Sequence, residues 1–149
     1  MNLQKILTLF FLVIFISSCS LEQADTVSDA PSIVSIGVPF QIAVGETVSF
    51  EGHYLTFNRV DSDSRCPIDV KCIWAGEATV VLVPQDNDIM YDEVHISTQT
   101  TDALTYLAPD NKDTFGYVVS LNSLSPVHEV GKEIQQSEYI ATLTISLLE

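Results

Sequence analysis

The chain has 149 residues, with 20 acidic and 6 basic side chains and a formal net charge of −14 at pH 7. This length is typical of one domain. A surface this acidic repels phosphate backbones, which excludes nucleic-acid binding, and it disfavours docking of the folded domain on anionic lipid. The charge itself is typical of a surface that keeps a domain in solution.

The N-terminus has the layout of an export signal. Lys5 precedes the apolar run Ile6–Ile16, and small residues follow the run. A basic start, a short apolar stretch and small residues are typical of a secretory signal peptide. The run is too short for a transmembrane helix, which needs about 20 apolar residues.

The apolar run ends in the sequence ISSC, Ile16–Cys19. This motif resembles the lipobox of bacterial lipoproteins, in which an aliphatic residue and two small residues precede an obligatory cysteine. The resemblance implies that residues 1–18 are a lipoprotein signal peptide and that Cys19 becomes the first residue and carries acyl chains such as palmitate. The alternative is an ordinary signal peptide with a chance cysteine.

The same resemblance implies a location in the bacterial cell envelope, with the membrane as a partner through the N-terminal lipid. Ser20 after the cysteine is compatible with the outer membrane, on its periplasmic or surface side. The stretch Ser20–Ser32 is polar and acidic and contains Pro31, so residues 19–32 are expected to be the lipidated cysteine and a flexible tether. Thirteen flexible residues have a root-mean-square reach of about 20 Å.

Residues 33–149 are expected to form a β domain. Apolar and polar residues alternate between turn signals, and no 3.6-residue period is sustained. Strands are expected at 47–57, 78–84, 89–98, 115–121 and 139–148, with turns at 85–88 and 109–113. The predicted fold is all-β: a single antiparallel β-sandwich, Ig-like or similar, of about seven or eight strands with one disulfide. A β-barrel is the alternative.

Three segments carry more specific expectations. A change of parity near Gly52 predicts a bulge or bend within a strand. The nearly continuous apolar run Ala78–Pro84 predicts a central strand that is covered on both faces. The segment Ser123–Ser137 is expected to hold a long loop or a short helical turn. One face of the last strand is predicted to be apolar, through Tyr139, Ala141, Leu143, Ile145 and Leu147.

The sequence DSRCPIDVKCIWAGEA, residues 63–78, contains the other two cysteines and the only tryptophan. With Cys19 lipidated, Cys66 and Cys72 remain in an exported chain, which predicts a disulfide between them. The alternative is two free thiols. Because a disulfide holds its Cα atoms about 5.5 Å apart, the chain must fold back within CPIDVKC.

Two residues after the bridge are given structural roles. Trp74 follows Cys72 by two positions, so on a strand both would point to one side, and a buried indole beside the disulfide is expected. Gly76 is expected to leave space for neighbouring backbone or for the ring. Residues 61–64 are expected to form a loop before the bridge. The pattern DSRCP followed by CIWAGEA resembles one in uncharacterised bacterial secreted proteins and lipoproteins, which implies a shared β domain and no known activity.

Several side chains are candidates for binding. Arg65, Asp69 and Lys71 could belong to a disulfide-stapled loop of the protease-inhibitor type, since a preorganised loop binds at lower entropic cost. Asp69 could also join Asp61 and Asp63 at a calcium ion, although acidic turns are common. The other candidate sets are His53, His95 and His128 for a metal, and Tyr54, Tyr91, Tyr106 and Tyr117 for a carbohydrate groove or, as the favoured interpretation, for core packing.

No HExxH, GxSxG, SxxK or phosphate-binding glycine motif occurs in the sequence. We therefore expect no cofactor, no metal and no enzymatic activity. The expected function is a lipid-anchored envelope module that binds an unknown protein or glycan, or that has a structural role. The alternatives are an inhibitor-like or carbohydrate-binding domain, and a hydrolase with an unrecognised carboxylate or histidine site.

Overall fold

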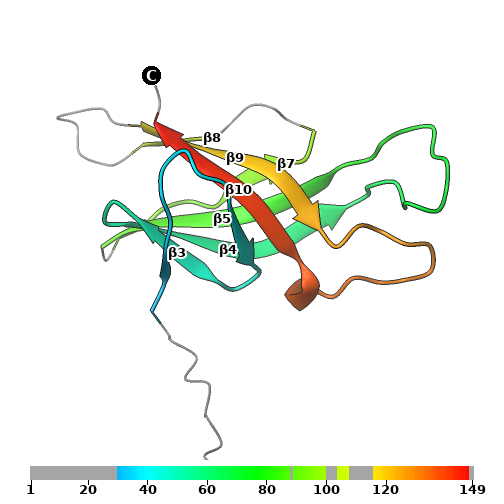
Figure 1. Ribbon diagram of the computed structural model, residues 1–149, viewed down its shortest axis with the longest axis horizontal. Helices are drawn as coiled ribbons and strands as arrows, with labels where there is room; N and C mark the ends of the chain where they lie inside the picture. The colour runs from blue at the N-terminus through cyan, green and yellow to red at the C-terminus, as the bar shows by residue number, and fades with distance from the viewer. Residues whose placement is uncertain (1–29, 88, 100–103, 108–115, 148–149) are drawn as a thin grey trace, which may run out of the picture.

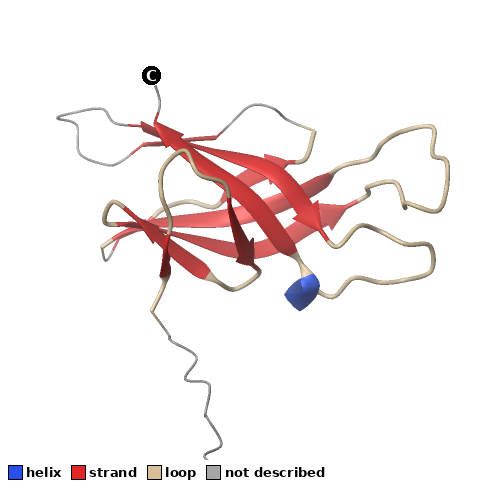
Figure 2. Cartoon of the chain, in the orientation of Figure 1, coloured by secondary structure: helices blue, strands red, loops and turns tan. Residues whose placement is uncertain are grey.

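The computed structural model describes residues 30–87, 89–99, 104–107 and 116–147. Two β-sheets pack face to face around one core, so the predicted all-β sandwich is confirmed (Figure 2). Both sheets are open, and the barrel alternative is therefore wrong. The signal peptide, Cys19, most of the expected tether and the expected turn at 109–113 lie outside the described residues. No helix in the described part of the chain is long and apolar enough to cross a membrane.

The larger sheet has six strands and the smaller has four (Figure 1). In the larger sheet, neighbouring strands follow the order β1 (Ser32–Ile33), β3 (Thr47–Phe50), β4 (His53–Asp63), β5 (Ala78–Asp86) and β6 (Ile89–Met90), and β7 (Val94–Ser97) also pairs with β5. In the smaller sheet the order is β2 (Phe40–Ala43), β10 (Ile140–Leu147), β9 (Gly116–Ser125) and β8 (Leu104–Leu107). All pairs are antiparallel except β1 with β3, which makes the larger sheet mixed.

The core lies between the sheets and follows the predicted alternation. Tyr139, just before β10, and Ala141, Leu143 and Ile145 within it are buried, whereas Leu147 is exposed near the end of the sheet. The consecutive residues Val80, Val81 and Leu82 of β5 are all fully buried. Because neighbours in a strand point to opposite faces, β5 is covered on both faces at its middle, as predicted.

The change of parity near Gly52 comes from a hairpin turn, so the prediction of a bulge within one strand is wrong. Strand β3 ends at Phe50 and β4 begins at His53, and the two pair antiparallel. Glu51 and Gly52 both have positive φ, +46° and +88°, as a tight two-residue hairpin requires. The irregularities in pairing occur further along β4, between Phe57 and Arg59 and between Val60 and Ser62.

Two other predicted boundaries also differ from the structure. Residues 61–63 continue β4 and pair with β5, so they are not the loop that the acidic sequence suggested. The expected strand at 89–98 is divided into β6 and β7. After β9, residues 126–135 form a loop that leads to the 3-10 helix η2 (Gln136–Glu138), which agrees with the predicted loop or short helical turn.

Two loops lie together at one end of the sandwich. The first, residues 64–77, joins β4 to β5 and is called the bridge loop. The second, residues 126–135, follows β9 and is called the companion loop. The backbone N–H of Ile68 donates to the carbonyl of His128 at 3.0 Å, which joins the two loops directly. In Figure 1 both loops project from the same end of the strands.

Candidate functional site

The disulfide closes the bridge loop, as the cysteine count predicted. Cys66 and Cys72 are bonded with their Cα atoms 6.0 Å apart. At the base of the loop, the N–H of Ser64 donates to Glu77 at 2.7 Å and that of Cys66 donates to Ala75 at 2.8 Å. These bonds continue the pairing of β4 with β5 beyond the sheet. The bridge loop is therefore a hairpin extension that is fixed at its base and covalently closed at its end.

Gly76 makes the close approach at the base of the loop possible. Its φ is +68°, a conformation that strains any side-chain-bearing residue. A Cβ atom built at this position would overlap the carbonyl group of Ser64. The neighbouring backbone for which Gly76 was expected to leave space is thus that of Ser64, the first residue of the bridge loop. The side-chain amide of Gln99 also donates to the carbonyl of Gly76.

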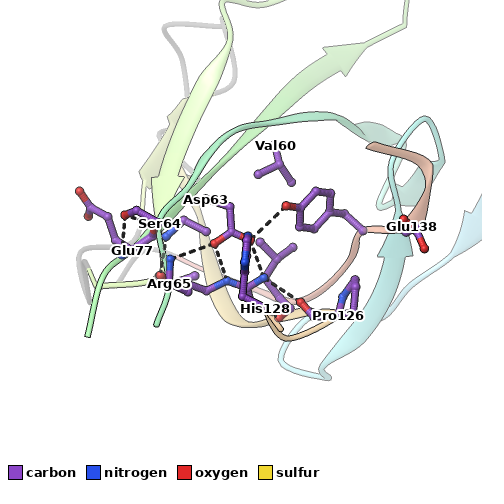
Figure 3. Close-up of polar contacts among 12 residues, drawn as sticks. Val60, Asp63, Ser64, Arg65, Glu77, Pro126, His128 and Glu138 are labelled. Carbon is purple, nitrogen blue, oxygen red and sulfur yellow. Dashed lines mark hydrogen bonds and ion pairs between the residues drawn. The ribbon is translucent and has the colours of Figure 1, made fainter. Parts of the chain in front are cut away.

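Arg65 fixes the bridge loop to the rest of the fold (Figure 3). Its Nε and Nη2 donate to the two carboxylate oxygens of Asp63 at 2.9 and 2.7 Å. Its Nη1 donates to the carbonyl of Leu124, and Nη2 donates to that of Pro126 at 2.7 Å. The guanidinium therefore joins the bridge loop to the end of β4, to β9 and to the companion loop.

Arg65 and Asp63 are largely buried. The Arg65 side chain is 15% exposed and the Asp63 side chain is 5% exposed. All of the hydrogen bonds above are made within the protein. The guanidinium of Arg65, a candidate binding residue from the sequence, is therefore engaged by acceptors within the protein.

Asp63 is held ionised by its neighbours. Burial raises its pKa, but the hydrogen bonds and charge of Arg65 and a hydrogen bond from Tyr139 outweigh burial, so the pKa lies below its ordinary value. The Tyr139 hydroxyl donates to Asp63 Oδ2 at 3.1 Å. Burial, followed by the charge of Asp63, raises the pKa of Tyr139 to about 12. His128 Nε2 lies 4.0 Å from the same carboxylate oxygen.

The companion loop is also tied to the bridge loop through a side chain. The N–H of Val130 donates to Asp69 Oδ1 at 3.3 Å. Together with the backbone bond from Ile68 to His128, this contact fixes the position of the two loops relative to each other. Asp69 is thus a cross-link between loops. Lys71, between Val70 and Cys72, is exposed.

The metal-site candidates are not brought together. Asp61 accepts a bond from Arg59, Asp63 is paired with Arg65, and Asp69 bonds the companion loop. Within the described ranges, no group of three or more histidine, cysteine or acidic side chains is arranged to hold a metal ion. The calcium and three-histidine arrangements considered from the sequence are therefore not formed by these residues.

Two of the four candidate tyrosines, Tyr91 and Tyr117, pack against the core. Tyr117 is buried in the core and packs edge-on against Phe50, with ring centroids 5.2 Å apart. Its hydroxyl donates to Glu51 at 2.8 Å. Tyr91 is partly buried against the same core. Core packing, the favoured interpretation, therefore holds for Tyr117 and Tyr91, while the side chain of Tyr106 lies outside the described set.

Trp74 is exposed, so the expectation of a buried indole beside the disulfide is wrong. Its exposed fraction is 82%, and that of Ile73 is 94%. The expectation assumed that Cys72 and Trp74 lie on a strand that faces the core. The chain instead leaves β4 after Asp63 and does not resume strand structure until Ala78, and the space between the sheets is filled by other side chains.

The two loops present further apolar side chains to solvent. We call the exposed apolar residues of both loops the apolar tip: Ile68, Val70, Ile73, Trp74, Val127 and Val130. Burying one such side chain is worth about 1.5–3 kcal/mol. Exposed apolar side chains that gather on one part of a surface are typical of interaction sites.

The charge of the loops differs from that of the body. Arg65, Lys71 and Lys132 are three of the four basic residues in the described part of the chain, and the fourth is Arg59 on β4. The two loops contain four acidic residues, Asp69, Glu77, Glu129 and Glu133, and are therefore close to neutral. The other described residues carry eight acidic side chains against Arg59 alone. The apolar tip is thus a nearly neutral end of an acidic body.

One structural residue of this end was not anticipated from the sequence. The side-chain amide of Gln136 accepts from the N–H of Val60 at 2.9 Å and donates to its carbonyl at 2.8 Å. It pairs with β4 beyond the last residue that β3 reaches, and so takes the place of a neighbouring strand. No local pattern marks this role, because the two residues are 76 positions apart.

No protein-family model matches the chain, and no curated protein and no solved structure is similar to it at the level of a significant match. The proposals below are therefore argued from the residues and contacts of this chain.

Proposed function

We propose that the protein is a lipid-anchored, non-enzymatic binding domain of a bacterial cell envelope and that the apolar tip is its binding surface. The observation that carries the proposal is the exposure of Ile73 and Trp74 on a loop whose shape is fixed. Large exposed apolar side chains raise the free energy of the free protein in water. Their burial against another molecule would recover that free energy.

The fixed shape of the loops supports binding over a purely structural role. The disulfide, the hydrogen bonds of Arg65 and the two hydrogen bonds between the loops all restrain loops whose apolar tip is exposed to solvent. A loop ordered before binding loses less conformational entropy when it binds. Bracing an exposed loop therefore favours recognition of a defined partner.

The anchoring part of the proposal is supported by the sequence ISSC at the end of an export signal. A single acyl chain gives reversible membrane binding, and stable anchoring needs more than one. We expect the native protein to begin at Cys19 and to carry the mass of two or three acyl chains, as measured by intact-protein mass spectrometry.

Substitution of the cysteine tests this anchoring directly. We expect Cys19→Ala to move the protein out of the membrane fraction, whereas Ser17→Ala keeps a small residue in the motif and should leave the protein membrane-bound. Both proteins are followed by fractionation and immunoblotting. A Cys19→Ala protein that fractionates with membranes as the wild type does would contradict lipid anchoring.

An inhibitor-like function is the second candidate, and the exposed Lys71 within the closed loop favours it. Proteases that cleave after basic residues would take Lys71 as the recognised side chain. We expect such an inhibitor to lose activity against a trypsin-like protease on Lys71→Ala and to keep it on Lys132→Ala, in a steady-state inhibition assay. Absence of inhibition by the wild type across trypsin-like proteases would exclude this candidate.

A further inference from the structure

We infer that the apolar tip docks into an apolar pocket on a protein partner and that basic side chains surround this pocket. The inference rests on the proposed binding function and names the chemistry of the partner. Three observations carry it: the rigidity of the two loops, the distribution of charge around them, and their position relative to the N-terminal end of the domain.

Rigidity favours a partner of fixed shape. Closure by Cys66–Cys72, the bonds of Arg65 and the contact of Asp69 with Val130 all restrain the two loops. A rigid convex tip gains from a matching concave pocket, since neither side has to be ordered on binding. On a fluid lipid surface, the binding free energy depends on the apolar area that is buried and not on a fixed shape. Tryptophan is also enriched among the residues that dominate protein–protein binding energies.

Charge favours a basic surround. The two loops carry four acidic and three basic side chains, whereas the other described residues carry eight acidic side chains against Arg59 alone. Next to the tip, Asp61 is paired with Arg59 and Glu129 with Lys132, so the negative field on a partner comes from the excess of acidic side chains over the described part of the chain as a whole. Basic side chains on the partner's surface would complement this field and accelerate association. Anionic lipid would be repelled by the same field.

Position favours a target other than the anchoring membrane. At the start of β1, Ser32 pairs with Val48, which in turn pairs with Leu55. Leu55 precedes the end of β4 by eight residues, or about 26 Å of strand. The N-terminal end of the domain and the apolar tip therefore lie toward opposite ends of the sandwich (Figure 1). Attachment at the N-terminal end of the domain would therefore leave the tip on the far side of the domain from the attachment point.

The first experiment uses the full-length chain in the cells that make it. A photo-crosslinking amino acid replaces Val70 in the tip or, as a matched control, the exposed Val38 outside the two loops. We expect position 70 to give one discrete protein adduct that falls at least tenfold when Trp74→Ala is added. Position 38 should not give this adduct.

The adduct alone does not establish the inference, so the identified protein is purified and its affinity is measured. We expect Trp74→Ala to raise the Kd at least tenfold, Val38→Ala to change it less than twofold, and added salt to weaken binding. Because Trp74 is exposed, its replacement should leave the fold intact, which circular dichroism and peptide mapping of the disulfide verify.

Several results would overturn the inference. They are the absence of any adduct, an adduct only with a second copy of the chain, and a Kd that Trp74→Ala or salt leaves unchanged. A bilayer target is tested with brominated phosphatidylcholine vesicles. Trp74 is the only tryptophan, and quenching of its fluorescence would show that lipid receives the tip. The purified Cys19→Ala protein should bind the partner as the wild type does, so a failure of lipid anchoring is distinguished from a failure of the docking inference.

Discussion

The Arg65 guanidinium meets one carboxylate and two backbone carbonyls, and it does so in a largely buried position. The planar fork is what allows one side chain to reach all of these acceptors at once. A lysine would keep the charge but would present a single ammonium group. We therefore expect a lysine at position 65 to keep the positive charge but to lose most of the hydrogen bonds that the guanidinium makes.

We expect Arg65→Lys to lower the free energy of unfolding by about 2–4 kcal/mol, because Asp63 loses its bidentate partner while it stays buried. Urea unfolding followed by circular dichroism measures this loss. Arg59→Lys is the matched control, since Arg59 makes a similar two-oxygen pair with Glu93 in an exposed position. The control should be close to the wild type, and equal losses in both variants would contradict the importance of burial.

Stability should depend on pH through Asp63, the carboxylate that pairs with Arg65. The pKa of Asp63 is lower in the folded protein than its ordinary value of about 4. Its contribution is therefore fully present above about pH 4 and is lost as the pH falls through the folded-state pKa. We expect the stability difference between the wild type and Asp63→Asn to be constant from pH 7 to 5 and to shrink below pH 4, in urea unfolding at each pH. A difference that stays constant down to pH 2.5 would contradict the pKa assignment.

At the scale of single elements, β4 extends beyond β3 and needs another partner along that edge. Gln136 of η2 provides it through two hydrogen bonds to Val60, a residue that is only 5% exposed. Leaving buried backbone groups without partners costs about 1–3 kcal/mol. The short helix η2 thus acts as a clamp on a strand of the opposite sheet.

We expect Gln136→Ala to lower the free energy of unfolding by about 1–3 kcal/mol, because both backbone groups of Val60 lose their partner. Ser137→Ala, one residue along the same helix at an exposed position, should change stability by less than about 0.5 kcal/mol. Guanidinium unfolding measures both. If Gln136→Ala left the free energy of unfolding unchanged, solvent would be able to replace the hydrogen bonds of Gln136 to Val60.

The elements also show which features the sequence could predict. The alternation in β10 and the apolar run in β5 are local patterns, and they correctly identified strands and their buried residues. The position of Trp74 could not be read in this way, because it depends on where β4 stops and on whether the core is already full. The pairing of Arg65 with Leu124 joins residues 59 positions apart, and no local pattern reports such contacts. Gly76 is intermediate, since the space it leaves for neighbouring backbone was expected, but the identity of that backbone, at Ser64, and the positive φ were not.

At the scale of the whole molecule, the body and the tip differ in their physical roles. The buried core consists of residues from both sheets together with Tyr139, and none of it comes from the bridge loop. Stability of the sandwich therefore does not depend on the apolar side chains of that loop. The loops in turn use a disulfide, a buried ion pair and backbone bonds, none of which adds apolar area to the core. This separation allows the tip to be changed without unfolding the body.

Removal of the disulfide tests that separation. The bridge closes a loop of only seven residues, so the chain-entropy relation gives about 2 kcal/mol for its contribution. We expect Cys66→Ser/Cys72→Ser to remain folded and to lose about this much stability in guanidinium unfolding. Amide hydrogen exchange should accelerate strongly at residues 64–77, whereas β5 and β10 should change only by the small global loss. An unfolded double variant would mean that the bridge loop supports the core after all, whereas unchanged exchange at 64–77 would mean that Arg65 and the companion loop alone fix the tip.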